Sequence, residues 1–215
     1  MTQIASASAA SELKHEAIRQ AGMAVFLERG YEAASMDMIA IAAGVSKQTI
    51  YNHFLSKEAL FRDIVEDMVS TLLQPIRVRT SPASTPEELL RAFGCDMLEM
   101  MLRPSSLALH RLIVAESARF PEFGRAIYEA GPGRLLAMLA DYLRRETCDG
   151  RLAVRCPELA ADQFIGMLTG RIQLRALLGV DESSSPRAIQ DRVHETVRSF
   201  LAVHAPSPAG RKSAG

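Results

Sequence analysis

The sequence contains no tryptophan and three cysteines, Cys95, Cys148 and Cys156, none of them in a C-x-x-C pair. An odd number of cysteines without that spacing is a poor basis for a disulfide framework or a zinc site, and it fits a reducing compartment. No apolar run approaches the ~18 residues that span a bilayer. The first residues also lack a basic stretch followed by a hydrophobic block, so no secretory signal is expected. These absences predict a cytoplasmic protein without a membrane partner.

The chain has no excess of positive charge, because 25 Lys and Arg balance 25 Asp and Glu. Up to Gln74 the acidic side chains outnumber the basic ones, nine to six. Since phosphate neutralisation supplies much of the affinity for nucleic acids, this balance argues against broad, sequence-independent DNA binding. The exception is local: residues 38–57 carry Lys47 and Lys57 and no acidic side chain.

Patterns typical of catalysis are also lacking. Ser11 and Lys14 formally match the S-x-x-K of acylating serine enzymes, but they stand at an unsupported helix start. His194 and Glu195 lack the second histidine of a metalloprotease helix. No nucleophile–base pair, phosphate loop or metal cluster stands out. The sequence therefore predicts neither an enzyme nor a bound cofactor or metal.

The sequence does contain a series of helical patterns. Nearly half of the 215 residues are hydrophobic (48%), which is enough for a sizeable core. Between Ala17 and Val25 the apolar residues recur at helical spacing, and no strand-like alternation is long enough to compete. Thr85, Pro86 and Glu88 form a capping-box pattern that starts another helix. We predict an all-α fold with a small N-terminal bundle and a larger C-terminal one.

Composition places the boundaries between these bundles. Residues 1–10 are expected to be a disordered tail, and residues 11–74 an N-terminal domain that ends before Pro75, which should end or kink its last helix. The Ser-, Thr- and Pro-rich stretch 79–86 resembles a linker. Residues 75–205 are expected to form the C-terminal domain, and 206–215 a second disordered tail.

The stretch 42–60, AAGVSKQTIYNHFLSKEAL, predicts a helix, a glycine turn and a second short helix at about residues 46–54. At 100° per residue, Ile50 and Phe54 point together toward a core. The other faces are polar and carry Lys47, Gln48, Thr49, Tyr51, Asn52 and His53. Gln and Asn can pair with adenine and Lys with guanine in the major groove, so the pattern favours a helix-turn-helix over an ordinary solvated helix.

The segment SMDMIAIAAGVSKQTIYNHFLSKEALF (residues 35–61) resembles the DNA-binding signature of the tetracycline-repressor (TetR) family of bacterial regulators. The resemblance implies a dimer bound to a pseudo-palindromic operator in double-stranded DNA. By position, it implies base or nearby backbone contacts from Lys47, Gln48, Tyr51 and Asn52, and phosphate contacts from Ser35, Thr49, His53 and Lys57. Met36 and Asp37 depart from the polar or basic contacts common in the family, which puts base reading by the preceding helix in doubt.

The second half of the chain is similar to the AefR-like branch of the same family, which implies a dimerising, ligand-sensing bundle. Candidate lining residues for a mostly apolar inducer are Phe93, Met97, Met100, Met101, His110, Phe123, Tyr128, Met138, Phe164, Met167 and Arg171. Methionines adapt to varied ligands, but they fill ordinary cores equally well. Gly166 and Gly170, four residues apart, suit either a dimer seam or packing within one chain.

Three classes of function follow, and the leading one is a dimeric DNA-binding repressor released by a small molecule. Cysteine oxidation or a protein partner could replace the small molecule as the signal. A non-specific architectural DNA binder is disfavoured by the acidic balance, and a helical enzyme by the missing catalytic groups.

Overall fold

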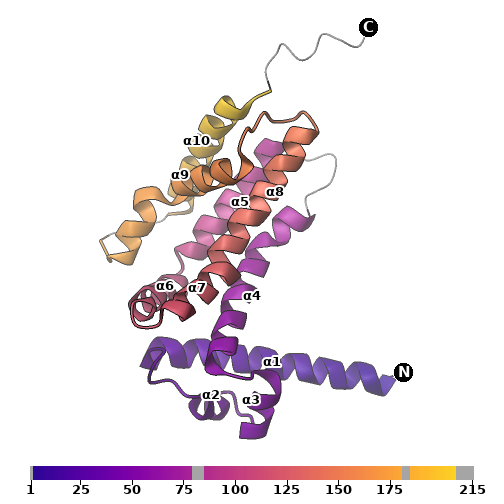
Figure 1. The fold of residues 1–215 in the computed structure, drawn as a ribbon, viewed down its shortest axis with the longest axis vertical. Helices are drawn as coiled ribbons and strands as arrows, with labels where there is room; N and C mark the ends of the chain where they lie inside the picture. Colours follow the sequence, from indigo (N-terminus) through magenta and orange to yellow (C-terminus); the bar gives the residue numbers. More distant parts are fainter. Residues whose placement is uncertain (1, 79–84, 181–184, 207–215) are drawn as a thin grey trace. The chain divides into compact units, whose positions relative to one another are not determined.

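The computed structural model describes residues 2–78, 85–180 and 185–206, and every regular element in these ranges is a helix (Figure 1). The all-α prediction is confirmed. In chain order the elements are α1 (Thr2–Arg29), α2 (Met36–Ala42), α3 (Lys47–His53), α4 (Lys57–Val78), α5 (Pro86–Met101), α6 (Pro104–Ser117), α7 (Pro121–Tyr128), the π-helical turn η1 (Glu129–Gly133), α8 (Arg134–Cys148), α9 (Pro157–Leu177) and α10 (Pro186–His204). Among these described helices, none is long and apolar enough to span a membrane.

Two of the predicted boundaries change. Residues 2–10 belong to α1 and are helical, not a disordered tail. Helix α4 does not end at Pro75, because it continues to Val78. The proposed C-terminal tail lies outside the described residues from position 207 onward, and so does most of the proposed linker.

The chain forms two compact units whose division differs from the predicted one at residues 74 and 75. The first unit contains residues 1–68 and also 108–131, so it includes most of α6 and all of α7. The second contains residues 69–107 and 132–215. Sequence order alone did not indicate that a later segment joins the N-terminal helices.

The core of the first unit joins α1, α2, α3 and α4 with side chains from α6 and α7. Ile18, Phe26, Ile39, Ile50, Leu60 and Phe61 are each 0% exposed. Leu109 of α6 and Ile127 of α7 are buried in the same cluster. Phe26 packs edge-on against Phe61, with ring centroids 5.0 Å apart. This shared core fixes α3 in place while leaving its outer face open.

The second unit is built on α9, which packs against α5, α8 and α10. Phe164 of α9 lies 5.0 Å from Phe200 of α10 and 6.4 Å from Phe93 of α5, ring centroid to ring centroid. Helix α9 is broken at Gly170, where φ is +36°. The guanidinium of Arg192 on α10 donates hydrogen bonds to the carbonyls of Leu168 and Met167, just before the break.

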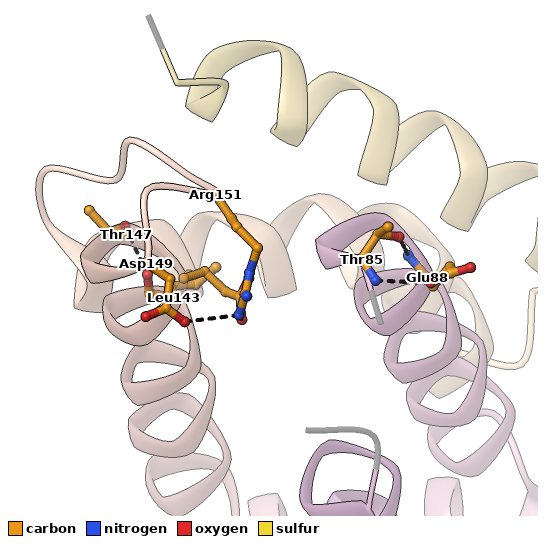
Figure 2. Close-up of polar contacts among 7 residues, drawn as sticks. Thr85, Glu88, Leu143, Thr147, Asp149 and Arg151 are labelled. Atoms are coloured by element: carbon orange, nitrogen blue, oxygen red, sulfur yellow. Dashed lines mark hydrogen bonds and ion pairs between the residues drawn. The ribbon is translucent and has the colours of Figure 1, made fainter. Parts of the chain in front are cut away.

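Local hydrogen bonds fix the ends of the second unit's helices (Figure 2). At α5, the backbone N–H of Thr85 donates to the Glu88 carboxylate (2.9 Å), and the Glu88 N–H donates to the Thr85 hydroxyl (3.2 Å), which confirms the predicted capping box. After α8, Arg151 donates to both oxygens of the buried Glu146 carboxylate (2.6 and 2.8 Å) and to Asp149 (3.0 Å). These bonds hold the loop that leads into α9.

Candidate nucleic-acid interface

Helices α2 and α3 are short and are delimited by side-chain caps. The Ser35 hydroxyl accepts a hydrogen bond from the Met38 N–H (3.2 Å), and the Ser46 hydroxyl accepts one from the Thr49 N–H (3.1 Å). Gly44 between them has φ +65°, a conformation that a residue with a Cβ resists. The result is a helix, a tight turn and a second helix, as the sequence predicts.

The four predicted base-reading residues of α3 all lie on its exposed side. Lys47, Gln48 and Asn52 are exposed, and Tyr51 is 40% exposed. On the opposite side, Ile50 is fully buried and anchors the helix. The Gln48 amide Nε2 donates to the Asn52 Oδ1 at 2.9 Å, which holds the two amides side by side. Helix α3 therefore presents an ordered polar face on a fixed support.

Lys47 forms an ion pair with a residue of the preceding helix. Its ammonium donates to the Asp37 carboxylate of α2 at 2.8 Å, and this hydrogen bond, with the charge of Asp37, raises the pKa of Lys47. Sequence analysis singled out both residues without joining them, because they lie ten positions apart on different helices. Only the turn at Gly44 brings them together.

Three of the four predicted phosphate-binding residues lie at the ends of these helices. Ser35 is exposed, and Thr49 is half-buried with its hydroxyl 2.8 Å from that of Ser46. His53, the last residue of α3, is also half-buried, and its ring centroid lies 5.7 Å from that of His15 on α1. Burial, followed by the charges of His15 and Lys14, lowers the pKa of His53.

Lys57 makes its contacts within the fold. Its ammonium donates to the backbone carbonyls of Tyr31 (2.6 Å), Glu32 (3.0 Å) and Ala34 (3.0 Å). An ammonium has three N–H donors, so these bonds use all of them. The ammonium also lies 4.5 Å from the centre of the Tyr31 ring, and burial lowers the pKa of Lys57. Lys57 holds the loop between α1 and α2, and its protons are not available to a phosphate in this arrangement.

The connection between α6 and α7 supports the same loop, a feature that sequence analysis missed. Arg119 forms a paired ion contact with Glu32, using both of its terminal nitrogens. Phe120 contacts the Tyr31 ring edge-on at 6.3 Å. Burial raises the pKa of Tyr31 to about 12, and the negative charges of Glu58 and Glu116 add to the shift. The apolar spacing of Leu109, Leu112 and Ile113 was the available signal, but it does not say which helices they meet.

The predicted ligand-pocket residues are divided between the two units. His110 and Tyr128 belong to the first unit and are exposed, and the side chain of Phe123 lies outside the described part of the chain. In the second unit, Phe93, Met97 and Phe164 are each 0% exposed and belong to the packed core. Met100, Met101 and Met138 are half-buried at the edge of that core, while Met167 and Arg171 are exposed.

The two predicted seam glycines differ from each other. Gly170 is explained within the chain, because it permits the positive φ of the α9 break and lies under Arg192. At Gly166 no atom of the described residues beyond its own helical turns lies within 4 Å of where a Cβ would stand, so close packing within the chain does not account for it. The same helix leaves several apolar side chains 41–68% exposed: Leu159, Met167, Leu174 and Leu178 at its end.

The cysteines and metal-binding residue types form no further site in the part of the chain that is described. Cys148 and Cys156 are exposed free thiols, and Cys95 is half-buried. Burial raises the pKa of Cys95, and the nearby Glu99 and Asp96 act in the same direction. Among the described residues, no group of three or more His, Cys, Asp or Glu side chains is arranged to hold a metal ion.

Comparison with known proteins connects both halves of the chain to regulators. Residues 18–64 match the sequence profile of bacterial regulatory proteins of the tetR family. Residues 88–206 match the profile of the AefR-like transcriptional repressor C-terminal domain. A curated relative, the HTH-type transcriptional activator FasR of Mycolicibacterium smegmatis, is 41% identical over 68 residues, which are 32% of this chain and 31% of FasR. The match to this curated relative therefore spans about a third of its length.

Solved structures extend the similarity to nearly the whole chain. A TetR-family transcriptional regulator from Mesorhizobium loti is 33% identical, with a TM-score of 0.77, over 91% of this chain and 98% of that one. The flavonoid-responsive regulator FrrA is also 33% identical, with a TM-score of 0.69, over 90% of this chain and 97% of its own.

Proposed function

Because the chain belongs to the TetR family of bacterial transcriptional regulators, we propose that it is a dimeric, cytoplasmic repressor that a small molecule releases from its operator. The observation that carries the proposal is the exposed polar face of α3 on a buried anchor. Repression, rather than activation, is favoured by the match of residues 88–206 to the AefR-like repressor domain. The match to the activator FasR covers only 68 residues, 32% of this chain.

In this proposal α3 enters the major groove and its side chains read base edges. Gln48 and Asn52 carry amides suited to adenine, and Lys47 carries a donor suited to guanine. Tyr51 adds an exposed aromatic ring next to them. Ser35, Thr49 and His53 contact phosphates and set the register of the helix, without reading sequence themselves. Lys57 is left out of this set because its protons bind backbone carbonyls.

Dimerisation follows from the small size of this reading face. One seven-residue helix offers few base contacts, so two copies related by a two-fold axis and bound to a pseudo-palindrome are the expected arrangement. Helix α9 is the proposed seam, together with α10, because it leaves Leu159, Met167, Leu174 and Leu178 open to solvent beside the bare Gly166. Covering such side chains removes apolar area from water, which favours association.

A small, mostly apolar molecule is the proposed inducer. The structural relative FrrA is described as flavonoid-responsive, which supports an aromatic ligand for this chain. We narrow the candidate ligand contacts to Met100, Met101 and Met138, whose side chains are half-buried at the edge of the second core. Phe93, Met97 and Phe164 are left out of this set because they are fully buried in the packed core. A ligand acts through its differential affinity for the DNA-competent form, typically about 1–3 kcal/mol.

The first experiment tests DNA reading. The purified protein is used to select duplexes from a randomised pool, and the selected duplex is then tested against the variants Gln48→Ala and Asn52→Ala. Each variant should lose about 1–3 kcal/mol of specific binding if the amide makes a good bidentate base contact. Unchanged selectivity in a folded Gln48→Ala protein would show that α3 does not read the sequence through this residue.

The second experiment tests induction. A thermal-shift screen with a flavonoid panel should yield compounds that raise the melting temperature, and some of them should release the selected duplex. Replacing Met100 or Met138 by Lys should remove both effects while the protein stays folded. If stabilisers leave DNA binding unchanged, small-molecule induction is wrong, and oxidation of the exposed Cys148 and Cys156 becomes the next test.

A further inference from the structure

The helix-turn-helix has very little positive charge available to DNA. Between residues 35 and 57, all of which the structure describes, the basic side chains are Lys47, Lys57 and the partly buried His53. Lys57 donates its three protons to backbone carbonyls. His53 has a lowered pKa, because of burial and neighbouring positive charge. Lys47 is the remaining cation of the reading face, and it is the one that Asp37 holds.

The geometry of the Asp37–Lys47 pair makes it a feature of the DNA-facing surface. Asp37 lies in the first turn of α2 and Lys47 is the first residue of α3, so the pair bridges the two helices across the turn. The two side chains are 55% and 67% exposed, and their charged atoms are 2.8 Å apart. An ion pair this exposed contributes little to folding stability, which leaves room for a role in binding.

We propose that Asp37 is a specificity-determining residue, which holds Lys47 in the free protein and thereby weakens binding to DNA of arbitrary sequence. The proposal rests on α3 being the reading helix. Binding to arbitrary DNA comes from cations that replace counterions at phosphates. A lysine paired with a carboxylate adds no net charge to that process.

The correct sequence changes the balance because it offers directed acceptors. Guanine presents O6 and N7 together in the major groove, and a lysine ammonium can donate to both. Lys47 then exchanges Asp37 for the two guanine acceptors, whereas arbitrary DNA offers it only the charge of the phosphates. The Asp37–Lys47 ion pair therefore breaks at the operator and remains formed on other DNA. Asp37 thus increases the ratio of specific to non-specific affinity more than it increases the specific affinity itself.

The test replaces Asp37 by Asn in the full-length chain. Binding is measured by fluorescence anisotropy over a range of salt concentrations, on two duplexes of equal length and composition. One is the duplex that the wild-type protein selects from a randomised pool, and the other is its scrambled version. Asp37→Asn should bind the scrambled duplex about two- to fivefold more tightly, the range for one exposed ion pair. The salt slope on that duplex should steepen by about one unit.

Two further variants separate the proposed role from a general charge effect. Glu58→Gln changes the net charge by the same amount but removes a carboxylate that is paired with Arg62 on α4, so it should leave the preference between duplexes unchanged. In the double variant Asp37→Asn with Lys47→Ala, the gain on scrambled DNA should disappear, because that gain acts through Lys47. Circular dichroism melts check that each variant is folded.

Each other result overturns the proposal. If Asp37→Asn and Glu58→Gln strengthen both duplexes equally, Asp37 acts only through net charge. If Asp37→Asn weakens the selected duplex without strengthening the scrambled one, Asp37 reads a base directly. Failure of the underlying function is distinguishable, because in that case Gln48→Ala would also leave the preference between duplexes unchanged.

Discussion

Lys57 offers the sharpest test of how the DNA-binding unit is held together. Its ammonium binds the carbonyls of Tyr31, Glu32 and Ala34 at 2.6, 3.0 and 3.0 Å. The substitution Lys57→Met keeps an unbranched stem of similar length but removes the charge and all three donors. The loop between α1 and α2 should then lose the three hydrogen bonds that connect it to α4.

The size of the effect follows from these bonds. A hydrogen bond from a charged donor contributes roughly 1.5–3 kcal/mol to stability. The three bonds here share one half-exposed ammonium, and carbonyls at the surface regain water when it is removed, so the contributions do not add fully. We expect a loss of about 2–3 kcal/mol in the free energy of unfolding. For a chain of this size that corresponds to a fall of about 5–10 °C in melting temperature.

Chemical denaturation and thermal melting of the purified variant measure this loss. Arg62→Ala is the control, because it removes a cation of the same helix whose partner, Glu58, is solvent-exposed, and such pairs contribute less than about 1 kcal/mol. DNA binding distinguishes the two roles considered for Lys57. If Lys57→Met keeps its stability but weakens binding to every DNA sequence and lowers the salt slope by about one, the phosphate role is right and the structural one is refuted.

Three other predictions concern separate parts of the molecule. Gly166→Glu should fold normally yet abolish the proposed dimer in sedimentation, whereas Ala137→Glu on the exposed side of α8 should not; a dimeric Gly166→Glu protein would place the seam elsewhere. Arg151→Ala should lower the melting temperature more than Arg144→Ala, because it leaves the buried Glu146 carboxylate unpaired while the partners of Arg144 are exposed. Equal losses in melting temperature would contradict this. The lowered pKa of His53 leaves it neutral at neutral pH, and a phosphate would raise that pKa. DNA affinity should therefore rise as the pH falls below neutral and decline as the pH rises through the DNA-bound pKa, and His53→Gln should remove this dependence.

Local sequence patterns were sufficient to predict the elements of the reading site. Serine is a preferred helix cap, and Ser35, Ser46 and Ser56 each accept a hydrogen bond from a backbone N–H three residues later. Gly44 was predicted to make the turn, and its φ is positive. Caps and turns depend on residues within four positions of each other, so a single stretch of sequence contains all the information they need.

The sequence also determined which face of α3 is polar, because helical periodicity places Ile50 and Phe54 inward whatever they pack against. It did not determine how that face is ordered. The pairing of Lys47 with Asp37 depends on the angle between α2 and α3. The sequence pattern of these helices would be equally compatible with an unpaired Lys47.

Tertiary structure decided the remaining assignments. It showed that Lys57, a candidate phosphate ligand, binds the carbonyls of a loop 23–26 residues earlier in the chain. It placed Leu109 and Ile127 in the core of the DNA-binding unit, and it buried Phe93 in a packed core. Apolar periodicity predicts that a side chain is buried, but it does not predict which other side chain packs against it. Contact with any apolar neighbour removes the side chain from water and favours burial. Only the path of the chain in three dimensions supplies that neighbour.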